Sequence, residues 1–178
     1  MASFWNDANL EPKRSFRFYV TFGAAQLPHW LVKKVNRPTI TVGEVKHQYL
    51  IHSYYYPGKV EWNTVKFTLV DPVNPDAASQ MRLLLASAGY FHPANGQTNA
   101  GQLRTIGKGT GTAAVGSVLI TQINDAGAPV EKWQLNNAWI KSVTFSELSY
   151  DTEELSNIEL ELRYDWATLN DLKFQTPV

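Results

Sequence analysis

Alternating apolar and polar side chains mark most of this chain as a series of short β-strands. Residues 16–22 and 158–166 show the pattern most clearly, because every second side chain is large and apolar. The apolar face of the second stretch consists of Ile158, Leu160, Leu162, Tyr164 and Trp166. Further strands are expected over 30–35, 39–42, 60–70, 115–123, 130–135 and 138–145. We therefore expect a mainly β protein, an antiparallel sandwich or barrel.

An aromatic run lies within the stretch 47–62. The tyrosines 54–56 precede Pro57-Gly58, which predicts a strand, a tight turn at that dipeptide and a longer strand. Neighbouring side chains of a strand point to opposite faces, so Tyr55 takes the face that Tyr54 and Tyr56 do not. Aromatic side chains on both faces suggest that a partner covers the second face. Half-exposed tyrosines also form ordinary cross-strand pairs, and this alternative stays open.

One α-helix is predicted, at about 74–88. Asn74 can cap it, Pro75 suits its first position, and Gly89 is a plausible stop. Its apolar face consists of Ala77, Met81, Leu84, Leu85 and Ala88. The remaining segments are an N-terminal arm at 1–13, a flexible loop at 95–116 and a C-terminal tail at 167–178. The whole chain, 1–178, is expected to form a single domain.

Composition excludes several classes of protein. The chain has 178 residues and no cysteine, so disulfides and thiol catalysis are excluded. The N-terminus lacks the apolar region of a signal peptide, and no apolar run is long enough to span a bilayer. These features predict a soluble protein that is made in a cytoplasm. A net charge of zero argues against a dedicated nucleic-acid binder.

The charges are nevertheless unevenly distributed along the chain. Residues 1–60 carry eight basic and three acidic side chains, whereas residues 141–178 carry three basic and eight acidic ones. In the simplest interpretation the two ends meet within one monomer. The other interpretation is that copies dock head to tail, with a positive edge against a negative one.

Residues with catalytic potential are few. The histidines are His29, His47, His52 and His92, and no acidic partner lies at a metal-ligand spacing from them. His47 and His52 have opposite strand parity, which places them on different faces unless a bulge intervenes. Glu159 and Glu161 share a face, as a paired-carboxylate site requires, but a solvated strand face has the same pattern. We expect no enzyme activity, no metal and no cofactor.

Several segments together resemble the tail tube proteins of contractile-tailed bacteriophages. The matching segments are 31–35, Arg37-Pro38, 54–62, 69–76, 131–133, 137–140, 148–151 and 163–166, within the range 14–169. The resemblance implies a tube-type β-barrel or sandwich with one helix and without enzymatic residues. It also implies a structural virion protein that self-assembles into stacked hexameric rings, the inner tube of a contractile tail and conduit for DNA delivery. The location would be the phage tail, assembled in the host cytoplasm.

The same resemblance implies a set of partners. These are other copies of the chain, the tail sheath protein, baseplate and tail terminator proteins, and viral DNA that passes without specific binding, with no membrane. The alternatives are a tube protein of a related secretion or injection system, a carbohydrate-binding β-sandwich, and a small β-barrel hydrolase that uses Glu159 and Glu161.

Two groups of residues are predicted to serve a tube. The subunit interface is expected at Tyr49, Tyr54, Tyr55, Tyr56 and Trp62. The lumen is expected to be lined by Lys66, Thr68, Glu159, Glu161, Arg163 and Asp165, since a wall with excess negative charge would let a polyanion slide. The alternative for the second group is an outer face, against sheath or solvent.

Overall fold

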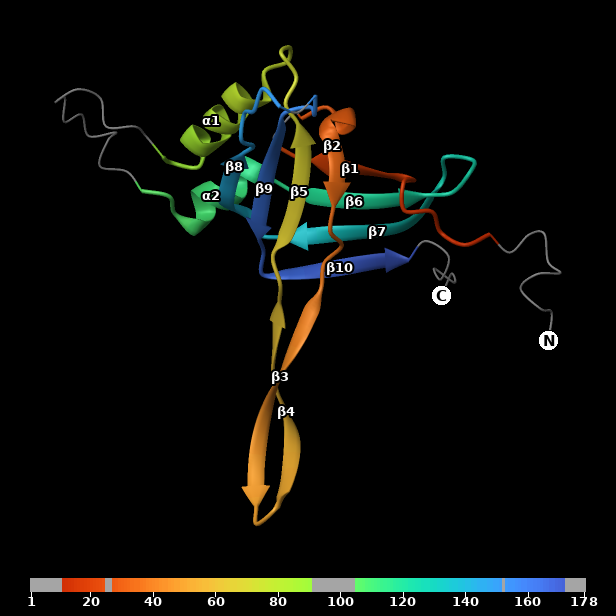
Figure 1. Ribbon diagram of the computed structural model, residues 1–178, viewed down its shortest axis with the longest axis vertical. Coiled ribbons are helices and arrows are strands. Elements are labelled where there is room, and N and C mark those ends of the chain that lie inside the picture. The colour runs from red at the N-terminus through yellow and green to blue at the C-terminus, as the bar shows by residue number, and fades with distance from the viewer. Residues whose placement is uncertain (1–10, 25–26, 91–104, 152, 172–178) are drawn as a thin grey trace.

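Two four-stranded antiparallel sheets enclose the core of the protein. The computed structural model describes residues 11–24, 27–90, 105–151 and 153–171. One sheet has the order β1 (Phe18–Phe22), β6 (Val118–Ile123), β7 (Pro129–Asn136), β10 (Trp166–Asp171). The other has the order β2 (Val32–Val35), β5 (Val65–Val70), β9 (Asn157–Arg163), β8 (Trp139–Phe145). Their strands run across each other (Figure 1). The predicted mainly β, antiparallel architecture is confirmed.

The core lies where the predicted apolar faces of the strands meet. Val65, Phe67 and Leu69 of β5 are fully buried, and Ile158, Leu160 and Leu162 of β9 lie opposite them in the ladder. The rings of Phe22 and Phe67 are 5.5 Å apart and join the two sheets. Side chains of a strand alternate between its two faces, and here one face is buried while the other meets solvent. The alternation in the sequence therefore correctly indicated which side chains of β5 and β9 are buried.

The stretch 158–166 is not one strand, in contrast to the prediction. β9 ends at Arg163, and the chain then bends and enters the other sheet as β10. The backbone N–H of Asp165 donates to the carbonyl of Asn136 (3.1 Å), which begins the pairing of β10 with β7. Tyr164 is buried, but Trp166 is 46% exposed. The predicted tail at 167–178 is therefore partly strand, and residues 172–178 lie outside the described residues.

The predicted helix is present as α1 (Ala77–Ser87), and it begins three residues later than expected. Asp76, not Asn74, is the N-cap, and its carboxylate accepts a hydrogen bond from the Ser79 N–H (3.2 Å). Met81, Leu84 and Ala88 are buried, as the spacing predicted. Gly89 has a φ of +108°, a conformation that suits glycine at the end of a helix.

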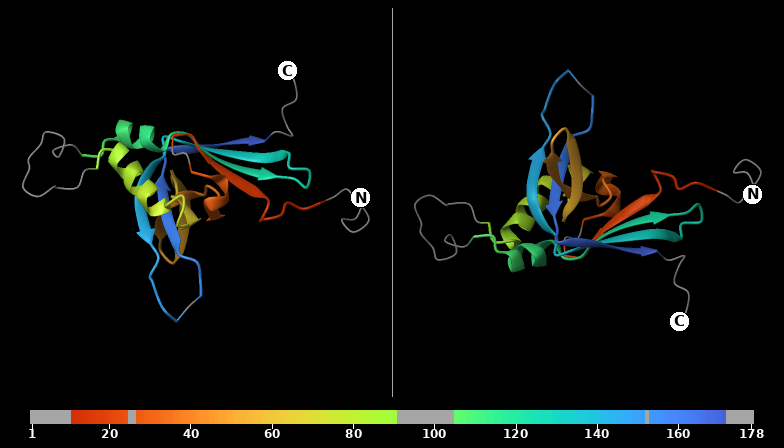
Figure 2. Two further views of the ribbon diagram at one scale, coloured as in Figure 1. Left: turned by 90° about the horizontal axis from the view of Figure 1, so that it is seen from above. Right: turned by 90° about the horizontal axis from the view of Figure 1, so that it is seen from below.

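A second helix, α2 (Lys108–Val115), occupies a stretch that was predicted to be loop. Glycines and threonines have low helix propensity, which is why the sequence did not indicate it. Gly111, Ala114 and Val115 are buried, and α2 lies beside α1 at one end of the sheets (Figure 2). Tertiary packing therefore outweighs propensity here. Residues 91–104, which include most of the rest of the predicted loop, lie outside the described residues, as do residues 1–10 of the predicted arm.

A long hairpin extends from the sheets (Figure 1). It consists of β3 (Ile40–Tyr49) and β4 (His52–Trp62), which form a two-stranded sheet of their own. The turn lies at Leu50 and Ile51, with a positive φ of 53° at Leu50, so the turn predicted at Pro57-Gly58 was wrong. That dipeptide lies within β4, where the register shifts opposite Gly43 as in a β-bulge.

Candidate assembly surfaces

The apolar side chains of the hairpin are exposed. Tyr54, Tyr55 and Tyr56 are 50–60% exposed. Tyr54 pairs with His47 and Tyr56 with Val45, so these side chains share one face, while Tyr55 is paired with Lys46 on the other. The further exposed apolar side chains of the hairpin are Ile40, Val42, Val45, Tyr49, Leu50, Ile51 and Val60. A two-stranded ribbon is marginally stable alone, and exposed apolar area of this extent is typical of an interaction surface.

Two histidines lie on the same face of this hairpin. His52 pairs with Tyr49, and His47 pairs with Tyr54. His47 and Tyr49 are two residues apart on β3, so both pairs point to the same face. The prediction of opposite faces was wrong because it assumed one strand, whereas the turn lies between the two histidines. Among the residues that the structure describes, no group of three or more His, Cys, Asp or Glu side chains is placed to hold a metal ion.

Trp62 differs from the tyrosines that were predicted to share its role. It is partly buried against the core, and its ring centroid lies 5.9 Å from that of Tyr164. Beside it, the Asn63 side-chain amide donates to the hydroxyls of Thr39 (3.2 Å) and Thr41 (2.8 Å). Trp62 therefore fixes the root of the hairpin to its own chain.

The outer face of the β2–β5–β9–β8 sheet brings together most of the residues that were predicted to line a lumen. Lys66 pairs with Glu161, and Thr68 pairs with Glu159. Arg163 follows on β9 with the same parity as these glutamates. This face is polar because the alternate residues of both strands fill the core.

Glu161 is held in its ionised form on this face. Its carboxylate accepts hydrogen bonds from Thr64 (2.6 Å), Lys141 (2.9 Å) and Ser142 (3.1 Å). The hydroxyl of Thr64, followed by the ammonium of Lys141, lowers the pKa of Glu161 to about 2. A carboxylate of this pKa does not carry the proton that a general acid must donate near neutral pH. Glu161 is therefore unsuited to the role of general acid in a hydrolase based on Glu159 and Glu161.

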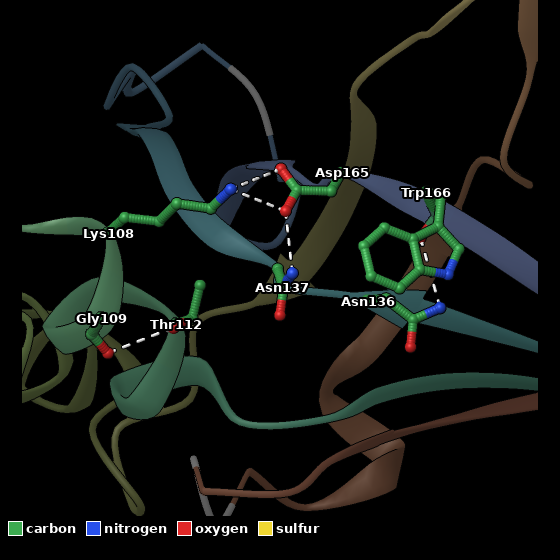
Figure 3. A network of polar contacts seen from close by, with 7 residues as sticks. All are labelled: Lys108, Gly109, Thr112, Asn136, Asn137, Asp165 and Trp166. Carbon is green, nitrogen blue, oxygen red and sulfur yellow. Dashed lines mark hydrogen bonds and ion pairs between the residues drawn. The ribbon is translucent and has the colours of Figure 1, made fainter.

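Asp165 lies apart from the other residues of this group (Figure 3). It is in the bend after β9, where its carboxylate contacts the Lys108 ammonium of α2 (2.7 and 3.0 Å) and the Asn137 amide (2.8 Å). The hydrogen bond from Lys108, followed by that from Asn137, lowers the pKa of Asp165. Sequence reasoning could not find Lys108 as a partner, because α2 itself was not predicted. Asp165 thus joins α2 to the bend where the chain changes sheets.

Glu131 is a buried carboxylate that sequence reasoning left without a role. It contacts the Lys13 ammonium, the Arg37 guanidinium (3.5 Å) and the Trp133 indole N–H (2.5 Å). Burial raises the pKa of Glu131, but the hydrogen bonds from Lys13 and Trp133 and the two positive charges outweigh it and lower the pKa overall. The residue joins the segment before β1 to the segment that leads into the hairpin. The sequence pointed to Glu131 and Arg37 only indirectly, because both lie in segments that resemble tail tube proteins.

Solved structures with a similar fold are known. No protein-family model and no curated protein sequence matches the chain. Among solved structures, a chain of the six-fold symmetrised baseplate of the anti-feeding prophage is similar, with a TM-score of 0.63 and 16% identity over 93% of this chain and 99% of that one. A chain of the PVC extracellular contractile injection system, in the extended sheath–tube complex, has a TM-score of 0.62 and 15% identity over 97% and 100%.

A third similar chain comes from the tube-terminating cap of the anti-feeding prophage. Its TM-score is 0.61 and its identity 17%, over 96% of this chain and 99% of that one. In the described ranges, neither helix is long and apolar enough to cross a membrane. The resemblance that the sequence indicated is confirmed at the level of the fold, which this chain shares with chains of contractile injection systems.

Proposed function

We propose that this chain is the structural subunit of a tube, in which rings of six copies stack to form the inner conduit of a contractile device. The observation that carries the proposal is the exposed tyrosine hairpin, which no part of the described chain covers. The shared fold supports it, because one similar chain belongs to a sheath–tube complex and another to an assembly with six-fold symmetry.

Ring closure follows from the two free edges of one sheet. β2 and β8 are the edge strands of the order β2–β5–β9–β8, and neither pairs with another described strand on its outer side. The successive pairings are antiparallel, so β2 and β8 run in opposite directions. β8 of one copy therefore pairs antiparallel with β2 of the next, and repetition around a ring leaves no edge of this sheet exposed.

In such a ring we place the polar outer face of this sheet on the lumen and the β1–β6–β7–β10 sheet on the outside. Lys66, Thr68, Glu159, Glu161 and Arg163 then lie on the wall, where Glu161 stays ionised but is paired with the Lys141 ammonium. Charged rings act mainly on molecules close to the wall, since the screening length is about 8 Å at physiological ionic strength. Asp165 is likewise paired with a lysine, Lys108.

The hairpin accounts for stacking. It continues beyond the sheets along the direction of β5 and β9 (Figure 1), which is the direction of the wall. A neighbouring ring stacked on this side covers the tyrosines on both faces of the ribbon. The apolar area that is exposed in one copy thereby becomes buried between copies, which supplies the driving force for polymerisation.

The test is a hairpin variant with a matched control. Tyr54→Asp with Tyr56→Asp should give a folded protein that no longer forms tubes, because buried carboxylates without partners are costly. Tyr54→Phe with Tyr56→Phe keeps the apolar rings and should still polymerise. Size-exclusion chromatography and negative-stain microscopy measure both. Tubes formed by the aspartate variant, or a wild-type protein that stays monomeric at high concentration, would overturn the proposal.

The device itself is a phage tail that delivers DNA or a related injection particle. The sequence resemblance favours the tail of a phage, whereas the similar solved chains come from injection systems. Particles purified with their sheath and baseplate distinguish these options. DNA packaged in an attached capsid indicates a phage, and tailed particles without capsid or DNA indicate an injection device.

A further inference from the structure

A groove with basic and aromatic walls lies along the β2 edge of the protein. It has a volume of about 630 Å³ and lies between the start of β1 and the segment His29–Lys34. Phe16 and Trp30 are 73% and 60% exposed in it. Lys33 and Lys34 provide positive charge, and among the described residues neither takes part in an ion pair.

The wall of this groove is fixed in place. The short helix η2 (His29–Leu31) carries Trp30, and the Nδ1–H of His29 donates to the carbonyl of Val20 (2.6 Å), which can only accept. The ring of Tyr19 also contacts that of His29 edge-on, with centroids 5.7 Å apart. The backbone that carries Trp30 is therefore held against β1, so binding of a partner does not require this backbone to become ordered.

A loop with the complementary chemistry leaves the opposite edge of the same sheet. The β8–β9 loop, 146–156, carries four acidic side chains and no basic one. Its described acidic residues are Glu147, Asp151, Glu153 and Glu154, and its described apolar residues Leu148, Tyr150 and Leu155 are 67–110% exposed. Its described parts, 146–151 and 153–156, extend away from both sheets (Figure 2). At the base of the loop, the hydroxyl oxygens of Ser146 and Ser156 are 3.2 Å apart and form a hydrogen bond.

The register of the sheet places the groove and the loop at the same level. Val32 pairs with Leu69, Leu69 with Ile158, and Ile158 with Phe145, so these four residues form one row across the sheet. Val32 lines the groove at one edge, and Phe145 immediately precedes the loop at the other. Where β8 of one copy pairs with β2 of the next in this register, the loop meets the groove.

We infer that the acidic β8–β9 loop of one copy docks into the basic aromatic groove of the adjacent copy in the ring. The inference rests on the proposed function and specifies the contact that orients neighbouring subunits. Leu148, Tyr150 and Leu155 pack against Phe16 and Trp30, and the surrounding carboxylates pair with Lys33 and Lys34. Because the two surfaces are different, the contact is head to tail and closes a ring.

Charge reversal on each side tests this contact. Lys33→Glu with Lys34→Glu, and separately Glu153→Lys with Glu154→Lys, should each reduce the ring fraction at least tenfold at about 0.15 M salt. An equimolar mixture of the two variants should restore rings, because the unchanged acidic loop of the first then meets the unchanged basic groove of the second, and the lysines introduced at 153 and 154 meet the acidic groove of the first. Six positions accommodate such alternating copies. Sedimentation velocity measures the ring fraction, and circular dichroism shows that each variant is folded.

Asp125→Lys, on the β6–β7 turn outside both surfaces, is the control and should assemble like wild type. If both double variants form rings as well as wild type does, the inference is overturned while the proposed tube function stands. If both fail and their mixture also fails, the assigned pairing is likewise overturned. If wild type forms no rings under any of these conditions, the proposed function itself fails.

Discussion

Trp62 and Tyr164 pack against each other with ring centroids 5.9 Å apart, at the point where the hairpin leaves the core. Tyr164 directly precedes the bend that carries the chain into the second sheet. One aromatic contact therefore joins the root of the hairpin to the connection between the two sheets.

Replacement of this indole should lower stability and loosen the hairpin. Trp62→Ala is expected to reduce the free energy of unfolding by about 2–3 kcal/mol, since it removes a partly buried ring from an aromatic pair. Trp30→Ala removes an indole that is mostly exposed and should cost less than about 1 kcal/mol. Urea denaturation followed by circular dichroism measures both. Equal losses for the two variants would contradict the anchoring role of Trp62.

Two glycines of the α2 region should respond in opposite ways to alanine. Gly116 has a φ of +70°, and a Cβ there would lie 2.6 Å from the backbone nitrogen of Ala24, so Gly116→Ala should destabilise the protein by at least about 1 kcal/mol. Gly109 lies within α2, with no atom within 4 Å of an added Cβ, so Gly109→Ala should stabilise it by about 0.5–1 kcal/mol. Thermal unfolding of the pair measures the sign; a stabilising Gly116→Ala would show that α2 ends differently.

The pKa of Glu161 predicts a pH dependence of stability. The folded state lowers this pKa from 4.5 to about 2, so the ionised form contributes stability above pH 4.5 that is lost as the pH falls toward 2. Glu161→Gln should therefore reduce stability at pH 7 by about 1–2 kcal/mol, with a smaller difference from wild type near pH 2. Urea midpoints from pH 7 to pH 2 measure this, and Glu159→Gln controls for the loss of one carboxylate as such. A constant difference across that range would contradict the prediction.

The position of Glu159 on the lumen wall can be tested by labelling, because the chain contains no cysteine. In tubes of Glu159→Cys, a small maleimide should react, whereas a maleimide on a long polymer should not pass along the bore. Both reagents should react with the unassembled protein. Asp125→Cys, on an exposed turn, is the control for an outer site. Rapid reaction of intact Glu159→Cys tubes with the polymer reagent would place this face outside.

The alternation of side chains by itself determined the inner and outer faces of β5 and β9. Because the side-chain period of a strand is two and one face must be buried, Phe67 and Leu160 had to point inward and Lys66 and Glu159 outward. The stripe of Met81, Leu84 and Ala88 likewise determined the existence of α1 and its buried side, although the cap was placed two residues too early.

Long-range pairing decided what local patterns could not. Pro57-Gly58 has the chemistry of a turn, but cross-strand pairing with β3 draws it into β4 and leaves Leu50 and Ile51 to reverse the chain. The alternation from Ile158 to Trp166 continues across a bend, because Asp165 begins the pairing with β7 in the other sheet. Glycine-rich residues of α2 are helical because a buried face packs there. In each case the deciding contacts come from residues distant in sequence, which only the tertiary structure brings together.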